Sequence, residues 1–318
     1  MVKRVLLASP RGYCAGVDRA IDTVELALER HGRPVYVRRQ IVHNAHVVAD
    51  LERRGVVFVD SENEVPPDEL LVFSAHGVPP EAHANAAARG LRTVDATCPL
   101  VTKVHSEARV FASLGYTIIL IGHEGHDEVE GTMGEAPEAI MLVQSREEAE
   151  RVEPAQVRRI AYLTQTTLSV DETREIVDVL RRRFPAIVGP KKEDICFATS
   201  SRQSAVKAML DEVDLVLVIG SENSSNSNRL VEVARAGGVP AHRIDDETEI
   251  AEVWLEGVEA VGLTAGASVP EQLVQSVCAW FRDRGVAEIK FHRTVYENVS
   301  FKLPTLPVSA MTPVRLAH

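Results

Sequence analysis

Short apolar runs alternate with helical patterns along the whole chain. Each run is rich in β-branched residues, ends in a polar turn, and is followed by apolar residues at the three- and four-residue spacing of a helix. This unit of strand, turn and helix recurs nine times, in three groups of three. Because such units build parallel sheets with helices packed on their faces, the pattern predicts an α/β protein made of three similar lobes.

The first unit of each group carries a cysteine at its turn. Val5–Ser9 leads to Cys14, Arg92–Asp95 leads to Cys98, and the pair Asp194-Ile195 leads to Cys196. A patterned helix is expected after each cysteine, and glycines end the first two of these helices.

The second and third units carry other polar residues at the same point, where a strand ends and a helix begins. The second units are Val35–Val42, Thr117–Gly122 and Leu215–Gly220, and the third are Leu70–Ser74, Ile160–Thr164 and Ala260–Leu263. The polar residues that follow these strands are His43, His126, Ser224, Ser225, Asn226, His76, Thr166 and Ser268.

Ligands of open parallel sheets bind beyond the carboxyl ends of the strands. The nine turns can therefore face one shared centre if the lobes close into a ring, which predicts small, mostly parallel sheets in a pseudo-threefold arrangement. The expected boundaries are 14–97 for lobe 1, 98–193 for lobe 2 and 194–290 for lobe 3, with residues 1–13 joining the sheet of lobe 3. Residues 291–318 form a C-terminal segment, and its last part, 301–318, has three prolines and no acidic residue, as in a docked or mobile tail.

Composition narrows the possible partners. The chain has 318 residues, of which 45% are hydrophobic and only 5% aromatic, so its cores must be mainly aliphatic. The net charge of −11 does not favour nucleic acid or an anionic membrane surface. No apolar stretch approaches the roughly 20 residues of a membrane helix, and the N-terminal apolar run is too short for a signal peptide. The expected location is the cytoplasm.

Four cysteines in a chain of this length do not form a disulfide framework. Thiolates are soft ligands that suit iron–sulfur clusters or zinc, and a helix N-terminus stabilises them. Closed structural zinc sites need four ligands and often use close cysteine pairs, which this chain lacks. Cysteines at three equivalent turns therefore indicate a metal site on Cys14, Cys98 and Cys196. We interpret Cys278, which lies among apolar residues, as core packing.

A series of ordered motifs makes the picture more specific. They are Arg11-Gly12-Tyr13-Cys14-Ala15-Gly16-Val17, Ile41-Val42-His43-Asn44, Ser74-Ala75-His76-Gly77, Asp95-Ala96-Thr97-Cys98-Pro99, Gly125-His126-Asp127-Glu128-Val129-Glu130-Gly131-Thr132, Thr164-Gln165-Thr166-Thr167 and the stretch Gly220–Arg229. From about residue 4 to 304 the chain closely resembles the LytB/IspH family of 4-hydroxy-3-methylbut-2-enyl diphosphate reductases. These enzymes catalyse the last step of the methylerythritol phosphate route to isoprenoids.

The resemblance implies an oxygen-sensitive [4Fe–4S] cluster, one per chain, on Cys14, Cys98 and Cys196, with one iron left open. It also implies the reductive removal of a hydroxyl from an allylic diphosphate, which gives isopentenyl and dimethylallyl diphosphates. Electrons would come one at a time from a ferredoxin- or flavodoxin-like donor. By the family pattern, Glu128 is the proton source and Thr166 orients the hydroxyl. The diphosphate is held by His43, His76, His126, Ser224, Ser225, Asn226 and Ser268.

Three other functions fit parts of the chain. A zinc hydrolase is suggested by His123-Glu124-Gly125-His126, but the spacing departs from the helical H-E-x-x-H motif. A non-catalytic iron–sulfur redox sensor would use the cysteines without needing a diphosphate pocket. A nucleotide-binding protein is disfavoured because the chain has neither a G-x-G-x-x-G motif after a strand nor a P-loop.

Overall fold

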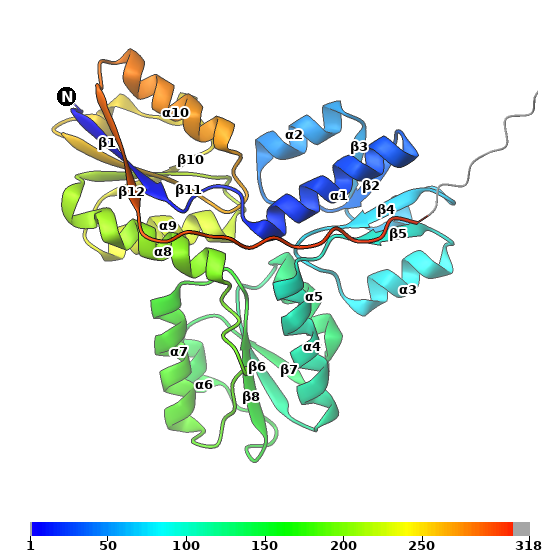
Figure 1. The fold of residues 1–318 in the computed structure, drawn as a ribbon. Helices are drawn as coiled ribbons and strands as arrows, with labels where there is room; N and C mark the ends of the chain where they lie inside the picture. Colours follow the sequence, from blue (N-terminus) through cyan, green and yellow to red (C-terminus); the bar gives the residue numbers. More distant parts are fainter. Residues whose placement is uncertain (1, 308–318) are drawn as a thin grey trace, which may run out of the picture.

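The computed structural model describes residues 2–307, which form three lobes around a common centre (Figure 1). Each lobe holds one small sheet, and every strand pair in the sheets of this described part is parallel. The prediction of three α/β lobes with small parallel sheets is therefore confirmed. None of the described helices is long and apolar enough to cross a membrane.

Lobe 1 contains a four-stranded sheet in the order β3-β2-β4-β5. Alternate residues of β4 point to opposite faces: Leu70 and Val72 pack with α1 and α2, whereas Leu71 and Phe73 pack with α3. The elements are β2 (Val35–Arg38), β3 (Val56–Val59), β4 (Leu70–Phe73), β5 (Arg92–Asp95), α1 (Ala15–His31), α2 (Ala45–Arg53), α3 (Pro80–Ala88) and the 3₁₀ turn η1 (Glu62–Glu64).

Lobe 2 contains a three-stranded sheet in the order β7-β6-β8. Ile118 and Leu120 of β6 pack with α4 and α5, and Ile119 and Ile121 pack with α7 on the other face. The elements are α4 (Pro99–Ser113), β6 (Thr117–Ile121), α5 (Asp127–Glu135), β7 (Ile140–Val143), α6 (Arg146–Arg151), β8 (Ile160–Thr164) and α7 (Val170–Arg183).

Lobe 3 contains a five-stranded sheet in the order β10-β9-β11-β1-β12. Val5 and Leu7 of β1 pack with α10, and Leu6 and Ala8 pack with α8 and α9. The elements are β1 (Arg4–Ser9), α8 (Phe197–Met209), η2 (Leu210–Glu212), β9 (Leu215–Ile219), α9 (Ser225–Ala236), β10 (Ala241–Ile244), η3 (Glu247–Glu249), η4 (Glu252–Leu255), β11 (Ala260–Ala265), α10 (Glu271–Asp283) and β12 (Glu288–Arg293).

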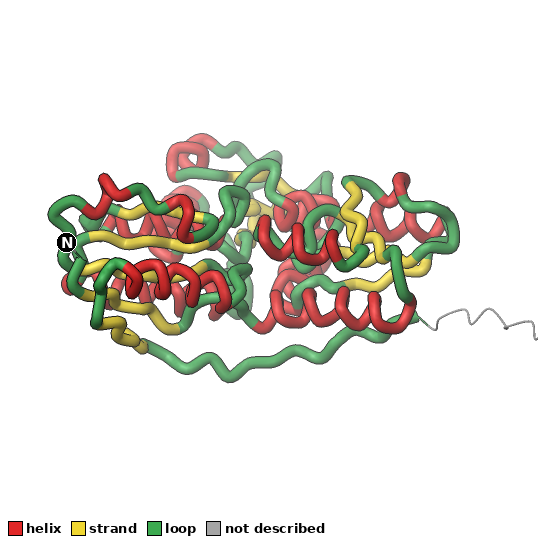
Figure 2. The backbone as a smooth tube through the Cα atoms, turned by 90° about the horizontal axis from the view of Figure 1, so that it is seen from above, coloured by secondary structure: helices red, strands yellow, loops and turns green. Residues whose placement is uncertain are grey.

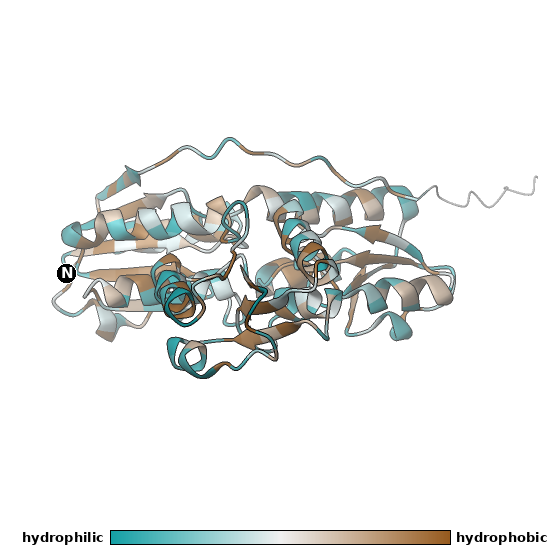
Figure 3. Cartoon of the chain, turned by 90° about the horizontal axis from the view of Figure 1, so that it is seen from below, coloured by the Kyte–Doolittle hydropathy of each residue, from teal (hydrophilic) through white to brown (hydrophobic). Residues whose placement is uncertain are grey.

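The three sheets are built on one plan, and covering helices enclose their apolar strands (Figure 3). In the sheets of lobes 1 and 3 the fourth position is taken by the strand that precedes a cysteine: β5 before Cys98 and β1 before Cys14. The predicted strand Asp194-Ile195 before Cys196 is wrong. A single parallel bridge between Ala161 and Val188 extends the sheet of lobe 2 at that place instead.

Two further predictions need correction. The strand predicted over Val35–Val42 ends at Arg38, because Arg39 adopts a left-handed φ of 55° and turns the chain out of the sheet. The boundary expected at residue 290 falls inside β12, which pairs with β1 through Arg293. Residues 308–318 of the expected tail lie outside the described residues.

Residues 294–307 form an extended strap that runs from lobe 3 to lobe 1 (Figure 2). At its start, Glu297 pairs with the fully buried guanidinium of Arg202 on α8, with a shortest N–O distance of 2.9 Å. Further along, the Lys302 carbonyl accepts a hydrogen bond from Arg19 on α1, and Leu306 enters the core of lobe 1. The strap therefore ties two lobes together across one side of the central pocket.

Candidate active site

One central pocket receives residues from all three lobes. Its lining includes each of the twelve residues that the sequence singled out: Cys14, His43, His76, Cys98, His126, Glu128, Thr166, Cys196, Ser224, Ser225, Asn226 and Ser268. They converge because every one of them follows the carboxyl end of a strand or begins a helix at the centre of the ring. Phe301 of the strap also lines this pocket.

The three cysteines lie at equivalent helix starts. Cys14, Cys98 and Cys196 are the N-cap residues of α1, α4 and α8. The Sγ of Cys196 accepts a hydrogen bond from the backbone N–H of Thr199 at 3.3 Å. A β-carbon on Gly16 would lie 2.7 Å from the Sγ of Cys98 and 3.8 Å from that of Cys14. Glycine at this position therefore leaves room around two neighbouring sulfurs.

The environment of the thiols favours a metal group over free thiolates. Burial raises the pKa of Cys98 to about 12 and that of Cys196 to about 11, and the neighbouring cysteines add to both shifts. Burial also raises the pKa of Cys14. The protein alone therefore holds three neutral thiols, which a bound metal group would deprotonate. Three converging soft donors at helix starts fit an iron–sulfur cluster.

Glu128 and Thr166 form a buried pair beside the cysteines. The Thr166 hydroxyl donates to the Glu128 carboxylate at 2.9 and 3.0 Å, and the Thr166 backbone N–H donates at 2.9 Å. Burial raises the pKa of Glu128, and the hydrogen bonds from Thr166 only partly oppose this effect. A carboxyl group in this environment can hold a proton that it later donates.

Three histidines form a cluster on one side of the pocket. The rings of His43 and His76 stack with their centroids 3.9 Å apart, and His126 meets both rings edge-on. The Nδ1 of His126 accepts a hydrogen bond from the Glu128 backbone N–H at 3.1 Å, which leaves its Nε2 to carry the ring proton. Burial lowers the pKa of His43 and His126 to about 4 each and that of His76 well below 6.5.

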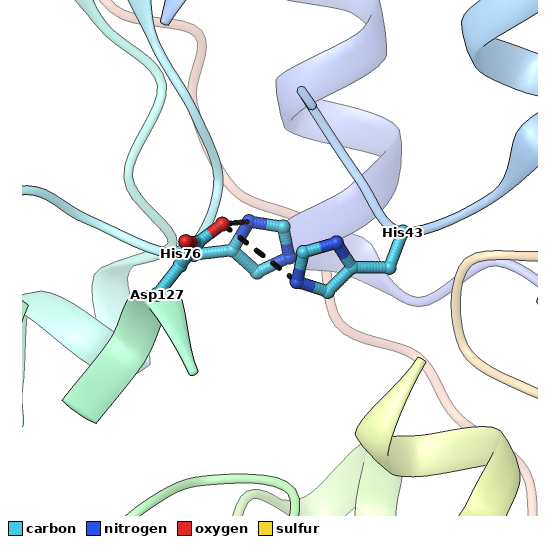
Figure 4. Close-up of side chains that lie close together, drawn as sticks. All are labelled: His43, His76 and Asp127. Carbon is cyan, nitrogen blue, oxygen red and sulfur yellow. Dashed lines mark ion pairs between the residues drawn. The ribbon is translucent and has the colours of Figure 1, made fainter. Parts of the chain in front are cut away.

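Asp127 lies against the two stacked rings (Figure 4). One of its carboxylate oxygens is 3.8 Å from the Nε2 of His43 and 3.7 Å from the Nδ1 of His76. These three side chains could together offer ligands to a metal ion. However, Arg39 pairs with Asp127 and, at 2.6 Å, with Glu130. The guanidinium therefore offsets part of the carboxylate charge beside the histidines and takes one of the two Asp127 oxygens.

The polar residues of lobe 3 complete the lining of the pocket. Ser224 is the N-cap of α9, so Ser225 and Asn226 occupy its first turn, where free N–H groups favour an anion. The Asn226 side chain accepts from the Ala267 N–H at 2.9 Å, and Ser268 donates to the His43 carbonyl at 2.8 Å. The latter bond joins lobe 3 directly to His43 of lobe 1.

Comparison with known proteins identifies the family. The family model described as LytB protein matches residues 5–282. The chain belongs to the LytB family. A LytB-family relative from Nocardia farcinica, named 4-hydroxy-3-methylbut-2-enyl diphosphate reductase, is 58% identical over 95% of this chain and 90% of its own length. A relative of the same name from Acidothermus cellulolyticus is 57% identical over 95% of this chain and 89% of its own.

Solved structures agree with this assignment. The E-1-hydroxy-2-methyl-but-2-enyl-4-diphosphate reductase of Plasmodium falciparum has a TM-score of 0.93 and is 37% identical, with 96% of each chain covered. Another solved LytB-type reductase, described as the terminal enzyme of the non-mevalonate pathway, has a TM-score of 0.61 and 31% identity over 89% of this chain and 100% of its own. The LytB family uses an iron–sulfur cluster, in accord with the three thiols.

Sequence reasoning assigned no role to four residues that lie at or near the pocket of this LytB-family chain. Asp127 stands in a quoted motif, but only the structure shows that it contacts two histidines from another lobe. Arg39 gives no sequence signal, because it lies inside the stretch Val35–Val42 that the sequence predicts as a strand. In the structure that strand ends before Arg39, which adopts a left-handed conformation. His105 has the pattern of an ordinary core residue of α4 and lies against Gly77 of lobe 1. Phe301 lies in the strap, whose path no local pattern predicts.

Proposed function

We propose that this chain uses the central pocket to remove the hydroxyl group of 4-hydroxy-3-methylbut-2-enyl diphosphate. The reaction takes up two electrons and two protons, breaks the allylic C–O bond and releases water with isopentenyl or dimethylallyl diphosphate. The observation that carries this proposal is the meeting of three thiols, one buried carboxyl group and an anion-binding wall in a single pocket. The names of the close relatives point to the same reaction.

The group that we propose for the thiols is one [4Fe–4S] cluster per chain, with Cys14, Cys98 and Cys196 as its protein ligands. Three cysteines leave one iron of such a cluster without a protein thiolate. When bound, the cluster would supply electrons one at a time and an open coordination position for the hydroxyl oxygen. Cys278 is not a ligand in this proposal, because it is buried within the core of lobe 3.

The diphosphate would lie between the histidines and the start of α9. His43, His76 and His126 offer ring N–H donors, and Ser224, Ser225, Asn226 and Ser268 offer hydroxyl, amide and helix-end donors. None of these residues is a lysine or arginine. Because the rings are neutral in the protein alone, diphosphate binding would favour their protonation and thereby raise their pKa values.

Glu128 and Thr166 would handle the proton and the hydroxyl group. The raised pKa of Glu128 keeps a proton available in a buried place, from which it can reach the departing oxygen. Thr166 holds the carboxyl group through its hydroxyl and its N–H, and the same hydroxyl can turn to the substrate hydroxyl. The electrons would come from a ferredoxin- or flavodoxin-like protein.

The direct test is turnover under strict exclusion of oxygen. The purified chain, reconstituted with iron and sulfide, is mixed with the allylic diphosphate and a chemically reduced one-electron dye. We expect oxidation of two dye equivalents per substrate and both five-carbon diphosphates among the products. A cluster-loaded protein that binds the substrate but forms neither product would refute the proposal.

A further inference from the structure

His105 lies at the junction of lobes 1 and 2, behind the pocket. It comes from α4, it is 5% exposed, and its Nδ1 is 2.9 Å from a carboxylate oxygen of Glu135 on α5. Arg109 reaches the other oxygen of Glu135 at 2.6 Å from the solvent side. The ring is therefore fixed at Nδ1 by a carboxylate that is itself anchored.

The opposite edge of the ring fits between two glycines of different lobes. A β-carbon on Gly77 would lie 2.9 Å from Cε1 of His105 and 3.2 Å from its Nε2. A β-carbon on Gly131 would lie 3.1 Å from the same two atoms. The Nε2 is buried and has no hydrogen-bond partner among the described residues. The imidazole thus fills a gap that exists only because neither neighbour has a side chain.

The two glycines stand next to parts of the proposed machinery. Gly77 directly follows His76, which belongs to the histidine cluster. Gly131 follows Glu128 by three residues, and Glu135 follows by seven, so all three lie on one face of α5. His105 covers the middle of that face. The ring therefore lies in the contact between the His76 loop and the Glu128 helix.

We propose that His105 is a positioning residue that sets the spacing between diphosphate-binding His76 and the proton donor Glu128. Glu135 and Arg109 hold the ring from one side, and Gly77 and Gly131 receive it on the other. This inference rests on the function proposed above, because it assigns His105 to the same reaction. It differs from a simple core role in one respect: loss of the ring should disturb anion binding and turnover together.

The test uses His105→Asn, with His83→Asn as the matched control. His83 is an exposed histidine of α3 whose ring packs against Phe73, away from the pocket lining. We expect His105→Asn to lower kcat/KM of the cluster-loaded enzyme by roughly ten- to a hundredfold, because small misplacements of reacting groups cost this much. We also expect weaker binding of inorganic pyrophosphate to the cluster-free protein by calorimetry. The control should change neither quantity.

A second variant keeps the test decisive if His105→Asn does not fold. Gly131→Ala pushes on the ring from the other side, and alanine favours a helix more than glycine does, so α5 itself should not be weakened. It should reduce both turnover and pyrophosphate affinity.

The inference is overturned if a folded variant of either kind keeps both quantities within about twofold of the wild type. It is also overturned if turnover falls while pyrophosphate affinity stays unchanged, since that result shows no link to His76. Failure of the proposed function looks different: the cluster-loaded wild-type chain itself would then form neither product from the allylic diphosphate.

Discussion

Replacing Glu128 by glutamine tests the proton donor without leaving a cavity at its position. The two side chains have the same shape, and the new amide oxygen can still accept one of the hydrogen bonds from Thr166. At most one neutral hydrogen bond is weakened, which costs about 1 kcal/mol of stability. The amide cannot donate a proton to a departing hydroxyl. Loss of general acid catalysis lowers rates by roughly 10²- to 10⁴-fold, which corresponds to about 3–5 kcal/mol in the activation free energy.

The assay compares kcat and KM of Glu128→Gln with those of the wild type, with iron and sulfide content measured on the same samples. Glu124→Gln is the control, because Glu124 is an exposed carboxylate on the turn before α5. We expect an unchanged cluster content, a similar KM and a kcat lowered by at least about a hundredfold. A kcat within about tenfold of the wild type, with the cluster intact, would refute the assignment of Glu128 as proton donor.

Three further changes test other parts of the structure. Thr166→Val removes a hydroxyl donor to a buried carboxyl group, a neutral hydrogen bond worth about 1 kcal/mol, and should lower kcat by roughly five- to tenfold; a raised KM at unchanged kcat would contradict this. Diphosphate binding should raise the pKa of His126 from about 4, so pyrophosphate affinity should increase as the pH falls from about 8.5 to 6. That increase should be smaller in His126→Asn. If calorimetric titrations give the same slope of affinity against pH for this variant and the wild type, the result would argue against protonation of His126. Glu297→Ala leaves the buried guanidinium of Arg202 without its carboxylate and should lower the free energy of unfolding by about 3 kcal/mol in urea; the exposed Glu288→Ala serves as control, and an equal effect of the two would count against this account of the strap.

Much of the fold follows from the sequence because the repeated unit is local. The strand runs, the helix faces and the cysteines at helix starts all depend on neighbouring residues, and the parallel sheets follow from them. The prediction failed where contacts between distant parts of the chain decide the local structure. Arg39 turns the chain out of a strand that Ile41 and Val42 would extend, and its guanidinium pairs with Asp127 and Glu130 of another lobe. Asp194 was assigned to a strand, yet its carboxylate is buried with Lys103 at 2.6 Å.

The candidate site shows the same division. The position after each strand singled out the polar residues, and the structure brings all twelve of them to one pocket. Residues that act between lobes left no local signal. His105 matches the helical spacing of any buried residue on α4, and its contacts with Gly77 and Gly131 arise only when lobes 1 and 2 meet.

The measurement that tests the central claim most directly is the iron, sulfide and zinc content of the chain purified and reconstituted without oxygen. The account predicts roughly four irons and four sulfides per chain, and loss of the cluster when any one of Cys14, Cys98 or Cys196 is replaced by serine. Cys278→Ser should retain the full content, since that cysteine lies in the core of lobe 3. Stoichiometric zinc without sulfide, even after reconstitution, would contradict the account.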